Sequence, residues 1–170
     1  MNHSVEKILY QKAALIFEEL GFLIPQSDIC DHYQTDNPCA VVTFRGPFVG
    51  CLLVSVTGEI LSTIAKNMLA REKPAGKQME EDALRELANV ICGNALPAIY
   101  GLKEVFHPDA PSIYENLQSV PILSEYSCIA QVAILFECGQ ANIFLYTQSK
   151  AVEYPVVVLQ GHVPRIKAAL

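Results

Sequence analysis

The stretch ELANVICGNALPAIYG, residues 86–101, restricts the fold of this chain more than any other part of the sequence. At about 100° per residue, most of its apolar side chains fall on one side of a helix. The polar positions Asp82, Glu86 and Asn89, followed by Gly93, fall together in a stripe about 60° wide on the opposite side. A helix with two such different sides has to bury its apolar side against a sheet or other helices.

Apolar periodicity and helix-breaking residues predict the elements around this helix. The helix itself is predicted from about Glu80 to about Leu102, with Pro97 expected to kink or divide it. Further helices are predicted at 4–20 and 58–72, hairpins at 39–45 with 48–56 and across 127–148, and strands at 120–124 and 153–161. Polar, turn-rich residues predict a loop at 25–38, a linker at 73–78 and a chain break at 107–111. The order predicts an α+β fold, one domain over 1–170, with two to three helices on a mainly antiparallel sheet.

Composition excludes several classes of function. The 170 residues carry a net charge of −6, and the 12 Lys and Arg are scattered. Nucleic acids and anionic membranes both require a basic patch, so neither is expected as a partner. No apolar run approaches the roughly 18 residues of a membrane span, and the N-terminal residues lack the apolar block of a signal peptide. We therefore expect a cytoplasmic protein.

The six cysteines show no pattern of a metal or disulfide site. They stand at 30, 39, 51, 92, 128 and 138, without a CxxC pair or ligand spacing to the four histidines. In a protein without an export signal they are expected to be buried free thiols. The histidines, at 3, 32, 107 and 162, have no local catalytic partner and are expected to be structural or exposed. No metal or other cofactor of its own is expected.

The polar stripe has two interpretations. It could be an ordinary solvated helix face, but it holds no Lys or Arg that we expect to pair with its acids, and such pairs are common on helix surfaces. Asn is a mediocre helix former and Gly costs about 1 kcal/mol against Ala, which suggests that the stripe is kept open for a partner. Glu86 and Asn89 include no nucleophile and too few ligands for a metal. They could instead grip a lysine and orient a water molecule next to a phosphorus atom.

The residues DALRELANVICGNALPAIYG resemble the signature helix of the CheC/CheX/FliY phosphatases of bacterial chemotaxis. In that family an Asp or Ser is followed by Glu and Asn at the spacing of Asp82, Glu86 and Asn89, and then by a proline, here Pro111. The GNA at 93–95, the FEELGF of the first helix and the strands around 41–56 are also similar. The Glu-x-x-Asn motif occurs once in this chain, and the second predicted helix, which contains EILSTIAKNMLA, lacks it. This single motif makes the chain most like CheX.

The resemblance implies a homodimer that removes phosphate from a phosphorylated CheY-like receiver domain. It assigns Asn89 to orienting the water and Glu86 to pairing with the receiver's lysine, with Asp82, Gly93 and Pro111 as binding positions. The receiver would supply the phosphoaspartate and its Mg²⁺. Two alternatives remain: a noncatalytic module that docks on a receiver or a flagellar switch component, and a CheX-like domain in a two-component system unrelated to motility.

Overall fold

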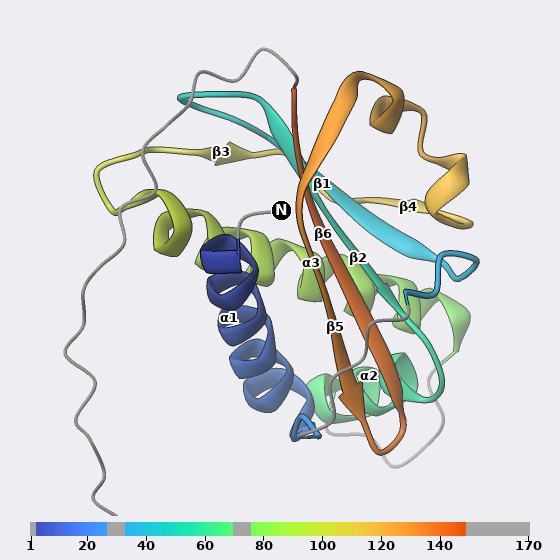
Figure 1. The fold of residues 1–170 in the computed structure, drawn as a ribbon. Helices are drawn as coiled ribbons and strands as arrows, with labels where there is room; N and C mark the ends of the chain where they lie inside the picture. The colour runs from blue at the N-terminus through green and yellow to red at the C-terminus, as the bar shows by residue number, and fades with distance from the viewer. Residues whose placement is uncertain (1–2, 27–32, 70–75, 149–170) are drawn as a thin grey trace, which may run out of the picture.

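The computed structural model describes residues 3–26, 33–69 and 76–148. The described strands form a six-stranded sheet in the order β3-β1-β2-β6-β5, with β4 also paired to β1 (Figure 1). All of these pairings are antiparallel. The strands are β1 (Cys39–Arg45), β2 (Gly50–Val56), β3 (His107–Pro108), β4 (Ser112–Tyr114), β5 (Tyr126–Phe136) and β6 (Gly139–Gln148).

Three helices cover one face of this sheet, which confirms the expected α+β class (Figure 1). They are α1 (His3–Gly21), α2 (Ile60–Leu69) and α3 (Lys77–Tyr100). Helix α3 begins three residues before the predicted start and continues for one turn past Pro97, so the proline does not divide it. None of the helices in the described ranges is long and apolar enough to cross a membrane.

The register of the strands explains where the core lies. Ala40, Val54, Ile143 and Val132 pair across β1, β2, β6 and β5, and all four are buried with the helices. Because side chains alternate along a strand, the neighbouring residues face the other way. Strands β1, β2 and β6 are therefore buried on both faces, whereas β5 alternates between buried and partly exposed residues.

The second face of the sheet is covered by the segment that follows β4. Two short 3₁₀ helices, η1 (Leu117–Ser119) and η2 (Pro121–Glu125), bring apolar side chains onto this face. The buried apolar residues on this face are Cys39, Val41, Cys51, Leu53, Val120 and Phe144. Burial raises the pKa of Cys39 to about 11 and that of Cys51 to about 12. These thiols therefore stay protonated near neutral pH and pack as small hydrophobic groups.

Two predictions about the second half of the chain were wrong. Residues 120–124 were predicted as a strand, but Pro121 opens the 3₁₀ helix η2 instead. Proline fits the first position of a helix because its φ is already helical. An N–H at that position would have no acceptor within the helix, so its absence costs nothing. Residues 107–111 were predicted only as a break, yet they contain β3 and lead into β4. The predicted strand at 153–161 and residue Cys30 lie outside the described residues.

Candidate functional site

Helix α3 carries the predicted stripe on its outer side. Its inner side buries Ala83, Leu84, Leu87, Ala88, Ile91, Cys92, Ala95, Leu96 and Ile99 against the sheet and the other helices. Asp82, Glu86, Asn89 and Gly93 are all exposed. The 3.6-residue period of the sequence thus places these four positions on one open surface, as the helical wheel predicted.

The C-terminal end of α3 is fixed by a glycine cap and a cluster of aromatic rings. Gly101 ends the helix with φ at 98°, a conformation that favours glycine, and its N–H donates to the carbonyl of Pro97 at 2.9 Å. Beyond it, Phe44, Phe48, Tyr100 and Phe106 form a cluster of ring contacts with centroids 4.8–6.0 Å apart. The cluster fixes the end of α3 against β1 and the turn that follows β1.

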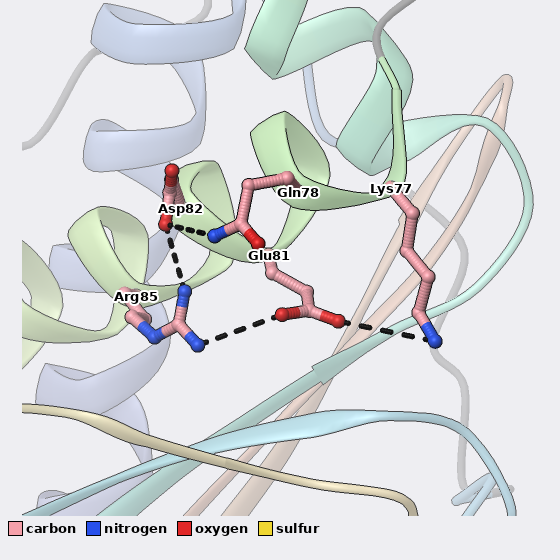
Figure 2. Close-up of polar contacts among 5 residues, drawn as sticks. All are labelled: Lys77, Gln78, Glu81, Asp82 and Arg85. Carbon is pink, nitrogen blue, oxygen red and sulfur yellow. Dashed lines mark hydrogen bonds and ion pairs between the residues drawn. The ribbon is translucent and has the colours of Figure 1, made fainter.

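Charged side chains on the first turns of α3 form a chain of contacts (Figure 2). Arg85 Nη1 lies 2.7 Å from Asp82 Oδ1, and its Nη2 lies 3.5 Å from Glu81 Oε2. Gln78 Nε2 donates to Asp82 Oδ1 at 3.2 Å, and Lys77 Nζ lies 4.0 Å from Glu81 Oε1. Figure 2 shows that two different nitrogen atoms of the Arg85 guanidinium face Asp82 and Glu81.

The expectation that no cation pairs with the acids of the stripe was therefore wrong. Arg85 follows Asp82 by three residues and Glu81 by four, and these are the spacings that bring side chains together on a helix. The carboxylate of Asp82 is engaged within its own helix. This signal was present in the sequence, since Arg85 lies at the border of the stripe.

Glu86 and Asn89 differ from Asp82. Within the described ranges, neither side chain makes a hydrogen bond or an ion pair, and both are exposed. The nearby Asn94 is also exposed, but its Nδ2 donates to the carbonyl of Val90 at 2.8 Å. The Glu86 carboxylate and the Asn89 carboxamide are one helical turn apart, so both are available to a single partner.

Gly93 continues this surface one turn further along the helix. A Cβ atom built on Gly93 would have nothing within 4 Å of it. The glycine is therefore not required by packing inside the described chain. A helix interior would be about 1 kcal/mol more stable with Ala, which agrees with the interpretation that this position is kept small for a partner.

Pro111 lies outside the exposed stripe of α3, in the connection between two short strands. It stands between β3 and β4, which both pair with β1 and both contact α3. Asp109 fixes this connection: its carboxylate accepts from Thr43 Oγ1 and from Arg45 Nη2, each at 2.8 Å, and its N–H donates to the carbonyl of Thr43 at 2.8 Å. No local pattern could have revealed this role of Asp109, because its partners are more than sixty residues away.

The arrangement supplies polar groups but no nucleophile. Cys92 lies on the buried side of α3, where burial raises the pKa of its thiol to about 12. In the described part of the chain, no group of three or more His, Cys, Asp or Glu side chains is placed to hold a metal ion. What Glu86 and Asn89 offer is an acceptor for a cation and an amide that can both donate and accept, on an open helix surface.

Comparisons with known proteins agree on one family. The family model described as chemotaxis phosphatase CheX matches residues 38–130, more than half of the chain. No curated protein matches the sequence.

Solved structures of similar fold include the chemotaxis protein CheX from Desulfovibrio desulfuricans, with a TM-score of 0.66 and 19% identity over 84% of this chain and 97% of that one. CheX from Vibrio vulnificus has a TM-score of 0.62 and 16% identity, over 83% and 94%. The CheX–CheY–BeF₃–Mg²⁺ complex from Borrelia burgdorferi has a TM-score of 0.59 and 12% identity, over 84% and 96%.

Proposed function

The chain belongs to the chemotaxis phosphatase CheX family, and from this premise we propose that it accelerates hydrolysis of the aspartyl phosphate on a CheY-like receiver domain. The observation that carries the proposal is the pair Glu86 and Asn89. Both are exposed on adjacent turns of α3, and neither is engaged within the described chain. The Borrelia burgdorferi structure contains a CheX bound to a CheY, which supports a receiver as the partner.

In the proposed reaction the protein contributes position rather than covalent chemistry. A water oxygen attacks the phosphorus, the bond between phosphorus and the receiver's carboxylate oxygen breaks, and inorganic phosphate leaves. Asn89 accepts a hydrogen bond from this water through Oδ1 and donates to a phosphoryl oxygen through Nδ2, which holds the water in line with the departing oxygen. Glu86 pairs with a lysine of the receiver and fixes the two proteins in register. The receiver's own Mg²⁺ offsets the charge of the phosphoryl group.

The test is phosphate release from a panel of phosphorylated receiver domains, with and without this protein. We expect Asn89→Ala to reduce the acceleration about 100-fold or more, because an orienting contact acts mainly in the transition state. Binding of the receiver in its beryllofluoride form should be nearly unchanged. Gln118→Ala, which removes an exposed amide from η1, serves as the control and should retain full activity.

Thermal unfolding separates this effect from a loss of structure. Asn89→Ala should melt with the wild type, whereas Leu87→Ala should lose about 2–5 kcal/mol of stability because it opens a cavity in the core. If Asn89→Ala keeps its activity, or melts as early as Leu87→Ala, Asn89 is not the catalytic amide. If Asn89→Ala and the wild type both bind a receiver without accelerating hydrolysis, the noncatalytic docking module becomes the better description.

A further inference from the structure

Two carboxylates on the exposed stripe of α3 could each accept a lysine from a partner. Asp82 and Glu86 are both exposed, and because they stand four residues apart they lie about 6 Å from each other along the helix axis. The side chain of Asp82 is 62% exposed, so the surrounding chain does not hide it from a docking protein. A lysine bound to Asp82 instead of Glu86 would shift its protein by about 6 Å along α3, out of line with Asn89.

Arg85 makes these two carboxylates unequal. Its Nη1 donates to Asp82 Oδ1 at 2.7 Å, and its Nη2 lies 3.5 Å from Glu81 Oε2 (Figure 2). Gln78 also donates to Asp82, but an amide is neutral and does not compensate the charge of a carboxylate. Among the described residues, no cation pairs with Glu86. Adjacent turns of the helix therefore present one compensated and one uncompensated carboxylate.

The spacing of Arg85 makes it selective for Asp82. Side chains three residues apart meet on a helix surface, whereas those of consecutive residues point about 100° apart and do not face each other. Arg85 follows Asp82 by three residues and directly precedes Glu86. Helical side chains also lean toward the N-terminus of their helix, which directs the guanidinium away from Asn89. Arg85 thus compensates Asp82 without engaging either residue of the site.

We propose that Arg85 sets the register of the receiver on α3, an inference that rests on the proposed function. By occupying Asp82, Arg85 leaves Glu86 as the carboxylate that the receiver's lysine takes. A lysine at Asp82 would have to displace a guanidinium of like charge, whereas at Glu86 it gains a contact and breaks none. An exposed ion pair of this kind favours the Glu86 register by about fivefold. Penalising a wrong pairing is a common source of specificity at interfaces. Arg85 is therefore a positioning residue, which acts on the alignment of Asn89 through Asp82.

The test begins from Glu86→Gln, which removes the correct carboxylate. Adding Arg85→Met keeps the hydrocarbon stem but frees Asp82, and the Kd for the beryllofluoride form of the receiver that the wild type binds most tightly should fall about fivefold. This regained binding should bring no hydrolysis, because it forms in the wrong register. A further Asp82→Asn change should return the Kd to that of Glu86→Gln alone. Lys77→Met is the matched control, since it removes one positive charge from α3 and its contact is with Glu81, at 4.0 Å. In the Glu86→Gln background it should change the Kd by less than about twofold.

Steady-state kinetics add a second readout with Glu86 intact. Arg85→Met alone should lower kcat and KM together by about twofold, because half of the bound receivers are then held in the wrong register. A purely structural role would lower kcat or raise KM without this matched fall. The variants should melt close to the wild type, since exposed ion pairs contribute little to stability, and circular dichroism melts check this.

The outcomes separate the register from the proposed function. If Arg85→Met leaves the Kd of Glu86→Gln unchanged, Asp82 does not compete for the lysine and the register role is overturned, while the proposed function stands. If Arg85→Met weakens binding in either background, Arg85 itself contacts the receiver, and the register role is again overturned. A wild type that binds a receiver but accelerates no hydrolysis would overturn the proposed function, whereas the comparison of Kd values would still decide the register.

Discussion

At the scale of single residues, the carboxylates of α3 differ in whether a cation of the same helix already holds them. Asp82 and Glu81 are held by Arg85, whereas Glu86 faces outward without a partner in the described chain. A carboxylate already paired has little to gain from a second cation, but a free one can add a charge-assisted contact of about 1.5–3 kcal/mol. Affinity for a cationic group should therefore depend on Glu86 more than on Asp82.

Replacing Glu86 with Gln keeps the size of the side chain and removes its charge. We expect receiver binding to weaken about 10-fold to 100-fold, the equivalent of one charge-assisted contact. Titration calorimetry at two salt concentrations measures this, and the variant should show the weaker salt dependence because an ion pair is lost. Glu104→Gln removes an exposed acid from the loop after α3 and should bind as the wild type does. An Asp82→Asn variant that weakens binding more than Glu86→Gln would contradict this assignment.

Gly93 allows a substitution with opposite effects on stability and activity. Ala at this position meets nothing within 4 Å in the folded chain, so Gly93→Ala should stabilise the helix by up to about 1 kcal/mol. The added methyl group should nevertheless raise the KM for the receiver, because it enters the space that the partner occupies. Gly76→Ala, also in open space but at the start of α3, should leave KM unchanged. Gly93→Ala with an unchanged KM would show that nothing approaches this position closely.

At the scale of elements, the connection between β3 and β4 depends on one carboxylate. Hydrogen bonds from Arg45 and Thr43 hold the pKa of Asp109 below its usual value. The ionised form therefore stabilises the fold above the pKa of the unfolded chain, about 3.9, and this contribution is lost as the pH falls through the lower pKa of the folded protein. Pro111 stands two residues after Asp109, so the position of this connection depends on the same contacts.

At pH 7, Asp109→Asn should have a lower melting temperature than the wild type. Below about pH 4 the difference between the two melting temperatures should shrink, because the wild-type carboxylate becomes protonated. Melts recorded by circular dichroism across this range measure the convergence. A difference between variant and wild type that does not change with pH would mean that the charge of Asp109 contributes nothing. Thr43→Val removes one of its donors without changing a charge, and it should lower the melting temperature in the same direction.

The long elements could be predicted from the sequence, because each carries its own repeating signal. Helix α3 is determined by apolar residues at three- and four-residue steps, and the hairpin of β5 and β6 by two apolar runs around Gly139. The edge strands β3 and β4 are too short for any period to appear, and they form because β1 offers them unpaired backbone groups. The positions of the site residues on α3 were likewise predictable, but the contacts of Asp109 required the tertiary fold.

At the scale of the whole molecule, we predict a homodimer. The chain is 51% hydrophobic and only 18% charged, which suggests a further interface beyond the cores of the described residues. The strand predicted at 153–161 lies outside the described residues. Light scattering at micromolar concentration should give twice the mass of the 18.7 kDa chain. A monomer mass at that concentration would contradict the prediction.

The two edges of the sheet have different consequences for aggregation. The outer edge of β1 pairs with two short strands, β3 and β4. Pro108 lies in β3, and Asp109 and Pro111 lie between β3 and β4. Short, proline-containing edges are poor templates for a further strand. Among the described strands, β5 pairs only with β6, and the N–H of Gln26 donates to the carbonyl of Leu135 on its other side. The two edges of the described sheet therefore differ, since the edge formed by β3 and β4 is blunted by short strands and prolines, which discourages extension there into a filament.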